Sequence, residues 1–150
     1  MNLFKFPNFE VLVDYAHNVG GLKAVGQFIE SLEVNHKVGI IAGVGDRRTE
    51  DFYELGQAAA NIFDEVIIRL DSDLRGKTAE EITQPLLKGI EDTNAGVKIE
   101  IIPEEMRAIA YALERAEPNS FIAVFTEDIS ESVKMVEHFK VIQDRKMLVE

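Results

Sequence analysis

The fold is decided by one stretch, Val11-Leu12-Val13-Asp14-Tyr15-Ala16-His17-Asn18-Val19-Gly20-Gly21. Its first three residues are apolar, as is typical of a buried strand, and an amphipathic run begins directly after it at Leu22. Between the two lies a polar turn with a carboxylate, an aromatic ring, an imidazole and an amide. This order places polar groups beside the free N–H groups of a helix start, which suits a nucleotide or another polar ligand.

The rest of the chain repeats this alternation of strand and helix. Four further apolar runs are predicted as strands, at residues 37–42, 65–70, 97–102 and 121–125. Apolar stripes at helical spacing predict helices around residues 22–32, 52–63, 79–90 and 106–113, and from about 129 to 140. Short connections between alternating strands and helices are typical of one α/β domain with a doubly wound, mostly parallel sheet flanked by helices, a Rossmann-like fold.

The sequence indicates the secondary structure of the two chain ends less directly than that of the middle. Residues 1–10 are expected to be an extended lead-in from a preceding linker, because Pro7 opposes a helix, and residues 11–150 are expected to be the domain itself. The tail, residues 141–150, fits either the end of a helix or a short edge strand.

Three local signals concern helix boundaries. The spacings of Thr78 with Glu81 and of Asp128 with Glu131 both predict helix N-caps. Pro85 falls within the third helical stripe and is expected to kink or to interrupt that helix.

Composition limits the class of function. The chain has 150 residues, of which 46% are hydrophobic and 29% charged, as is ordinary for one soluble domain. A net charge of −11 argues against nucleic acid or an anionic membrane as a partner, because both require a positive field. The absence of cysteine excludes disulfide and thiolate chemistry and favours a cytoplasmic location.

Polar side chains follow each predicted strand. Ligands of open parallel sheets bind beyond the carboxyl ends of the strands, where these groups are expected to gather. They are Asp14, His17 and Asn18, then Asp46, Arg47 and Arg48, then Asp71, Asp73, Arg75 and Lys77, then Glu104 and Glu105, and finally Glu127 and Asp128. Any one such loop has an ordinary alternative as a solvated turn or helix cap. Arginines near helix starts oppose the helix dipole, however, and therefore invite an anionic ligand.

Other motifs fit the sequence less well. Residues 71–82 open like a calcium-binding loop, but Ile82 stands where a carboxylate is needed. Gly43-x-Gly45 lacks the third glycine of a dinucleotide fingerprint. The three histidines are scattered and no cysteine completes a zinc site, so no metal ligand is assigned to this chain. No GxxxxGK[ST] element is present, so the main phosphate cradle of any ATP reaction is expected elsewhere.

Three segments together resemble the C-terminal domain of the Mur ligase family. Asp14-Tyr15-Ala16-His17-Asn18 resembles the DYAHNP motif that opens this domain in Mur ligases and folylpolyglutamate synthetases. Gly45-Asp46-Arg47-Arg48 resembles the family's GDR turn, and Asp73-Leu74-Arg75 stands where the family has a DNPR-type acceptor loop. Within the family, the combined pattern is most similar to the Mur-ligase-like half of cyanophycin synthetases. Val19 stands where the family usually has proline, so the first turn lacks the rigidity that a proline would give it, while its polar groups are retained.

The resemblance implies a domain of an ATP-dependent C–N ligase. In such ligases ATP phosphorylates a carboxylate, an incoming amine attacks the acyl phosphate, and an amide forms with release of ADP. The resemblance implies that a P-loop ATPase domain of the same ligase supplies most of the ATP and Mg²⁺ site. This chain alone is therefore expected to be inactive and to supply no catalytic residue. The alternative is a free-standing α/β domain that binds a nucleotide or an anion without catalysis.

The resemblance also implies roles for individual residues. Nucleotide contacts fall to Asp14, Tyr15, His17 and Asn18, with Asp14 at the ribose hydroxyls and His17 near the phosphates. Arg47 and Arg75 would hold the α-carboxylate of the incoming amino acid by charge-assisted hydrogen bonds. The other substrate would be a peptide-like carboxylate. The full set assigned to the acceptor amino acid is Asp46, Arg47, Asp73, Arg75, Glu127 and Asp128.

In cyanophycin synthetases the corresponding half is associated with the addition of arginine. A cationic acceptor would give the carboxylates of these loops a role as guanidinium partners. They are Asp71, Asp73, Glu127 and Asp128. The alternative is that they are solvated loop charges.

Overall fold

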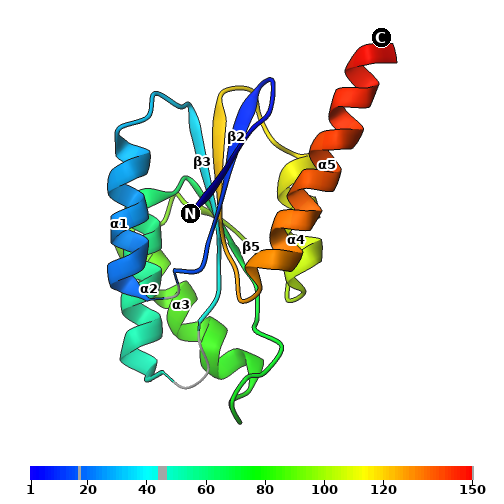
Figure 1. Cartoon of the computed structure of the whole chain (residues 1–150). Helices are drawn as coiled ribbons and strands as arrows, with labels where there is room; N and C mark the ends of the chain where they lie inside the picture. Colours follow the sequence, from blue (N-terminus) through cyan, green and yellow to red (C-terminus); the bar gives the residue numbers. More distant parts are fainter. Residues whose placement is uncertain (17, 44–46, 150) are drawn as a thin grey trace.

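A six-stranded sheet lies between two layers of helices in the computed structural model, which describes residues 1–16, 18–43 and 47–149 (Figure 1). The strands are β1 (Asn2–Lys5), β2 (Phe9–Asp14), β3 (His36–Ile41), β4 (Glu65–Ile68), β5 (Lys98–Ile101) and β6 (Ser120–Phe125). The helices are α1 (Val19–Glu30), α2 (Thr49–Ile62), α3 (Ala79–Thr93), α4 (Glu105–Glu114) and α5 (Ile129–Val149). None of the helices in these described ranges is long and apolar enough to cross a lipid bilayer.

The sheet order is β1-β2-β6-β3-β4-β5, and every neighbouring pair except β1 and β2 is parallel. This confirms the predicted doubly wound, mostly parallel α/β fold. The segment expected as an extended lead-in contributes β1, whose residues 2–5 pair antiparallel with residues 10–13 of β2. That pairing was not predicted, and the division of the chain at residue 10 stays a prediction.

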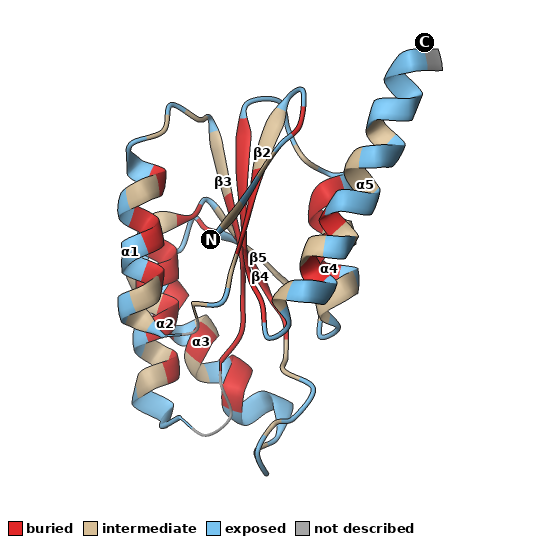
Figure 2. Ribbon diagram, viewed as in Figure 1, coloured by how far each residue is buried: buried red, intermediate tan, exposed pale blue. Residues whose placement is uncertain are grey.

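The five helices divide three to two over the faces of the sheet. Helices α1, α2 and α3 cover one face, and α4 and α5 cover the other (Figure 1). Side chains alternate along each strand, so each strand packs against both helical layers. In β2, Leu12 packs in the layer of α1, α2 and α3, and Val11 and Val13 pack in the layer of α4 and α5. Buried residues accordingly fill the central strands and the sheet-facing sides of the helices (Figure 2).

The backbones of α2 and α3 come into direct contact because glycine faces each crossing point. A Cβ atom added at Gly56 would lie 2.3 Å from the carbonyl oxygen of Leu86. One added at Gly89 would lie 2.1 Å from the carbonyl oxygen of Tyr53. Neither distance leaves room for a larger residue, so glycine fixes the separation of these two helices.

The structure settles the boundary questions that the sequence left open. Pro85 lies inside α3, which continues through it as one helix, and the tail continues α5 as far as Val149. The predicted cap at Thr78 is confirmed: its Oγ1 accepts from the N–H of Glu81, and its own N–H donates to the Glu81 carboxylate. Asp128 likewise accepts from the N–H of Glu131 at the start of α5.

The topology brings four strand ends to one place. Strand β6 lies between β2 and β3, so helix α1 crosses over β6 on one face while α4 leads into β6 on the other. The strand order reverses there, and open α/β sheets bind ligands at such a switch point. The segments that leave β2, β3, β4 and β6 meet at this carboxyl edge, at the lower end of the sheet in Figure 1.

Candidate functional site

A cavity of about 300 Å³, here called the edge pocket, opens at the carboxyl edge. It is lined by Tyr15, Ala16, Ala42, Arg47, Arg69, Asp71, Arg75, Phe125, Thr126 and Glu127. These residues come from the exits of β2, β3, β4 and β6. The edge pocket thus brings together four of the predicted site residues, namely Tyr15, Arg47, Arg75 and Glu127.

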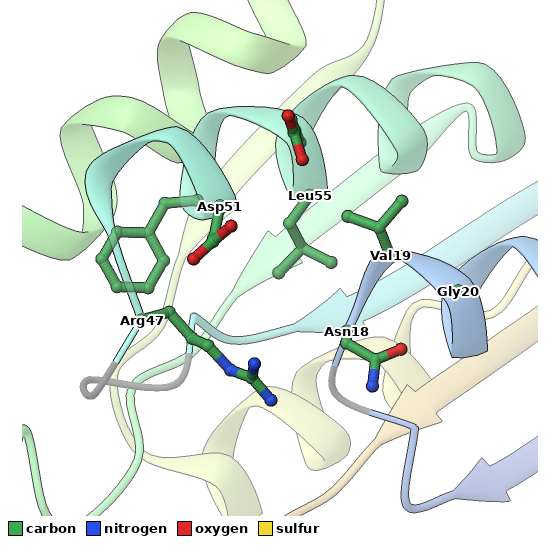
Figure 3. Close-up of a pocket in the computed structure, with 8 residues that line it drawn as sticks. Asn18, Val19, Gly20, Arg47, Asp51 and Leu55 are labelled. Carbon is green, nitrogen blue, oxygen red and sulfur yellow. The ribbon is translucent and has the colours of Figure 1, made fainter.

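A second cavity of about 320 Å³, here called the helix pocket, lies between the starts of α1 and α2 (Figure 3). It is lined by Asn18, Val19, Gly20, Arg47, Asp51, Phe52, Glu54 and Leu55. Arg47 extends across this pocket toward Asn18 in Figure 3. Arg47 lines both cavities, so the two are neighbours that share this residue.

Asp14 and Asn18 make local contacts around the first turn. The Oδ1 atom of Asp14 accepts from the N–H of Tyr15 at 2.7 Å. Asn18 is the N-cap of α1, and its Oδ1 accepts from the N–H of Gly21 at 2.8 Å. Asn18 therefore has a structural role in addition to any role toward a ligand.

Arg48 is paired at the start of α2, although it was expected to oppose the helix dipole there and to invite an anion. Its Nη2 lies 3.1 Å from Oδ1 of Asp51, and its backbone N–H donates to Oδ2 at 3.0 Å. The hydrogen bonds from Arg48 hold the pKa of Asp51 below its usual value, and the same contact raises the pKa of Arg48. Arg47 makes no ion pair with a carboxylate in the described part of the chain.

Arg75 and Asp73 form a compact turn ahead of α3. Asp73 Oδ1 accepts from the N–H of Arg75 at 2.8 Å, and Oδ2 lies 3.5 Å from Arg75 Nε. Both side chains are exposed, so this is the surface ion pair that competes with a role in ligand binding. Arg75 stands three residues before the cap of α3, so it lies near that helix start and not within it.

Glu127 and Asp128 follow β6 and contact different elements. Glu127 accepts from the N–H of Ser72 at 3.0 Å and from its hydroxyl at 3.3 Å, which ties the exit of β6 to that of β4. Asp128 caps α5 and does not line the edge pocket. Of these two predicted acceptor residues, the structure brings only Glu127 into the pocket.

Arg69 is the main residue of the edge pocket that sequence reasoning missed. It is 3% exposed, and its Nε and Nη2 both donate to the carbonyl oxygen of Phe125, at 3.1 and 2.9 Å. Its Nη1 donates to Asp71 Oδ1 at 2.7 Å. A single arginine ending an apolar strand was the available signal, because a buried cation requires several partners.

Glu105, in the first turn of α4, is the second buried charge here, with a side chain only 8% exposed. Its Oε2 lies 3.5 Å from Arg69 Nε, and its Oε1 accepts from Ser132 Oγ at 2.6 Å. Thr126 Oγ1 also donates to Glu105. Arg69 and Glu105 therefore join the loops of the sheet edge to both helices of the second layer.

Two predicted site residues, His17 and Asp46, lie outside the described residues. Within the described ranges, no group of three or more His, Cys, Asp or Glu side chains is arranged to hold a metal ion.

Comparison with known proteins shows which family the chain resembles. A family model described as "Mur ligase, glutamate ligase domain" matches residues 1–128. The chain is 39% identical over 142 residues to cyanophycin synthetase from Synechocystis sp., covering 95% of this chain and 16% of that protein. The chain thus spans about one sixth of the length of this relative.

Solved structures show the same fold. A UDP-N-acetylmuramoyl-L-alanyl-D-glutamate–2,6-diaminopimelate ligase is similar with a TM-score of 0.81 and 20% identity, over 96% of this chain and 31% of that one. E. coli FolC in complex with ADP is similar with a TM-score of 0.61 and 17% identity, over 92% of this chain and 29% of that one.

Proposed function

Because this chain belongs to the Mur ligase family through its glutamate ligase domain, we propose that it serves an ATP-dependent amide ligase of the cyanophycin synthetase type. In this proposal the chain does not carry out the phosphoryl transfer. It holds the incoming amino acid in the edge pocket and contacts the nucleotide at the helix pocket. A P-loop ATPase domain of the same ligase is its partner, and a peptide-like carboxylate is the other substrate.

The proposed reaction proceeds in two steps. The γ-phosphoryl group of ATP passes to an oxygen of the substrate carboxylate, which gives an acyl phosphate and ADP. The amine of the incoming amino acid then attacks the acyl carbon, inorganic phosphate leaves, and the amine loses a proton as the amide forms. Closure of the domains excludes water from the acyl phosphate, which would otherwise hydrolyse.

The observation that carries the proposal is the charge pattern of the edge pocket. Arg47 and Arg75, from two separate loops, line the same cavity as the carboxylates of Asp71 and Glu127. Guanidinium groups bind a carboxylate through paired hydrogen bonds, and carboxylates bind a guanidinium in the same way. A cavity with both fits an amino acid with a cationic side chain, of which arginine is our candidate.

Of the remaining acceptor residues, Asp46, Asp73 and Asp128 complete the proposed environment of the amino acid. The contacts that support Asp73 and Asp128 are indirect. Asp73 orients Arg75 through the ion pair at 3.5 Å. Asp128 fixes the start of α5 directly after Glu127.

For the nucleotide, the proposal uses the first turn of the chain. Its proposed contacts are Asp14, Tyr15, His17 and Asn18, with the ribose at Asp14 and the phosphates near His17. Among the described ones, Asn18 lines the helix pocket, and Tyr15 lines the neighbouring edge pocket. Asn18 and Gly20 open α1, whose free N–H groups favour an anion, and Arg47 lies across the same cavity. Arg47 then stands between the nucleotide and the amino acid.

Among the described residues of this chain, no group of three or more His, Cys, Asp or Glu side chains is arranged to hold a metal ion. We therefore assign Mg²⁺ mainly to the P-loop ATPase domain. The lack of cysteine agrees with the reducing cytoplasm, where we place the reaction.

The test compares three ligands by calorimetric titration of the chain. Agmatine is arginine without its α-carboxylate, and L-citrulline has a neutral urea in place of the guanidinium. L-Arginine is expected to bind roughly tenfold or more tightly than either, because each analogue loses a charge-assisted hydrogen bond of about 1.5–3 kcal/mol. Equal affinity for all three would contradict the acceptor site. Binding of ADP without any binding of L-arginine would instead favour a free-standing nucleotide-binding domain.

A further inference from the structure

Beneath the edge pocket, a closed ring of contacts joins the exits of β4 and β6 to the start of α4. We call it the Arg69 ring, and its members are Arg69, Asp71, Ser72, Glu127 and Glu105. Arg69 donates to Asp71, which precedes Ser72 in the chain, and Ser72 donates to Glu127. The N–H of Glu127 donates to Glu105 Oε2 at 3.4 Å, and that oxygen lies 3.5 Å from Arg69 Nε, which closes the ring.

Arg69 holds its place in the ring by geometry that lysine does not reproduce. Two of its nitrogens converge on one carbonyl oxygen, that of Phe125, while a third donates to Asp71. The planar guanidinium directs these donors along fixed lines, whereas an ammonium is a compact charge at the end of a flexible stem. The contacts at Arg69 therefore fix the relative position of two strand exits.

The ring also contains an imbalance of charge. The ring holds three carboxylates and one guanidinium: the carboxylates of Asp71 and Glu105 contact Arg69, and that of Glu127 accepts from Ser72. Like charges at these separations repel, and Arg69 is the cation that lies between two of them. Its removal or displacement would let Asp71 move away from Glu105 and toward solvent.

The ring reaches the proposed ligand directly, because Arg69, Asp71 and Glu127 all line the edge pocket. Asp71 offers its Oδ2 atom, which has no hydrogen-bond partner in the described part of the chain, while Oδ1 is held by Arg69. The two carboxylates proposed to receive a cationic side chain thus take their positions from the same buried arginine.

We propose that Arg69 is a positioning residue that holds Asp71 and Glu127 at the spacing that selects a cationic amino acid side chain. The proposal rests on the proposed function of the edge pocket and adds to it the determinant of side-chain specificity. Arg69 does not itself bind the ligand in this account. It acts through the carboxylates that it orders.

The test is Arg69→Lys in the whole chain, with two readouts. The first is hydrogen exchange of the amides of Ser72 and Glu127, which donate across the ring. Their protection should fall, while the amide of Lys37, which donates to Asp64 on the opposite edge, should keep its protection. The second is calorimetric affinity. Binding of L-arginine should weaken about tenfold and binding of ADP should change less than twofold, because the charge is kept and only the geometry is lost.

Two control variants separate positioning from a general loss of stability. Arg107→Lys makes the same exchange at an exposed arginine paired with Glu104, outside the ring, and should leave both readouts unchanged. Ile109→Val removes one methylene from the buried face of α4 and lowers the thermal midpoint without touching the ring. If Ile109→Val reproduces the effects of Arg69→Lys, the role of Arg69 is merely structural.

The outcomes also distinguish this inference from the proposed function. Unchanged protection of Ser72 and Glu127 in Arg69→Lys overturns the inference, whatever the ligand does. Unchanged affinity of that variant for L-arginine also overturns it, provided that the original chain binds L-arginine. An original chain that binds no L-arginine contradicts the proposed function, and the exchange rates alone then decide whether Arg69 holds the two strand exits. If Arg69→Lys does not fold, Ser72→Ala removes the hydroxyl contact to Glu127 and keeps the backbone N–H contact, which weakens the ring from its exposed side. Binding of L-arginine should then also weaken, and unchanged affinity would overturn the inference.

Discussion

Arg75 has a φ of 56°, an unusual conformation for a residue with a Cβ, and its side chain is 57% exposed beside Asp73. Two accounts explain its position. In one, Arg75 and Asp73 form a surface ion pair worth about 0–1 kcal/mol. In the other, Asp73 orients Arg75 so that its guanidinium can bind the carboxylate of an amino acid in the edge pocket. The two accounts differ in what a change of Arg75 does to ligand binding.

Arg75→Lys keeps the charge and removes the planar fork. We expect its affinity for L-arginine to fall roughly tenfold, since a charge-assisted bond of about 1.5–3 kcal/mol is lost, while the thermal midpoint stays nearly unchanged. Agmatine, which has no carboxylate for Arg75 to bind, should bind the variant and the original chain equally. Calorimetric titration with both ligands measures the effect. A lowered thermal midpoint with unchanged L-arginine affinity would mean that Arg75 is structural.

At the residue scale, sequence reasoning located the edge of the sheet better than the buried groups below it. The motifs predicted Tyr15, Arg47, Arg75 and Glu127, which line one cavity. Arg69 was missed because two of its partners are distant in the sequence: the Phe125 carbonyl, 56 residues away, and the Glu105 carboxylate on α4. Its place at the end of an apolar strand was the only local signal, and its role depends on these tertiary contacts.

At the element scale, the apolar periodicities of strands and helices predicted the order of ten elements, with ends displaced by a few residues. The pairing of β1 was not predictable, because a four-residue segment with alternating exposure carries little information about its neighbour. Pro85 did not break α3, even though it removes one backbone donor. The close packing of α3 on α2 holds the helix together across it.

Gly89→Ala tests that packing. The added Cβ would lie 2.1 Å from the carbonyl oxygen of Tyr53, and the backbone atoms on both sides cannot yield without separating α2 from α3. We expect a loss of about 1–3 kcal/mol in the free energy of unfolding, measured by urea denaturation. Gly20→Ala is the matched control: its Cβ would meet Asn18 Oδ1 at an ordinary 3.5 Å, so its stability should be unchanged or slightly higher. Equal effects of the two variants would contradict the close contact.

At the scale of the whole molecule, the topology explains why the edge pocket and the helix pocket lie side by side. The reversal of strand order at β6 gathers four strand exits at one edge, and Arg47 lines both the helix pocket and the edge pocket. The alternation of strands and helices predicted this edge, because parallel strands share their carboxyl ends. The cap at Asp128 was predicted from its spacing to Glu131 and is confirmed, whereas the capping role of Asn18 was not predicted.

The most direct measurement of the central claim is a pair of NMR titrations of the ¹⁵N-labelled chain, one with ADP and one with L-arginine. ADP is expected to shift the amide signals around the helix pocket, at Asn18, Gly20 and Asp51. L-Arginine should shift those around the edge pocket, at Ser72 and Glu127, and Arg47 should respond to both. Shifts from L-arginine that map away from the edge pocket, or no shifts at millimolar L-arginine, would contradict the central claim.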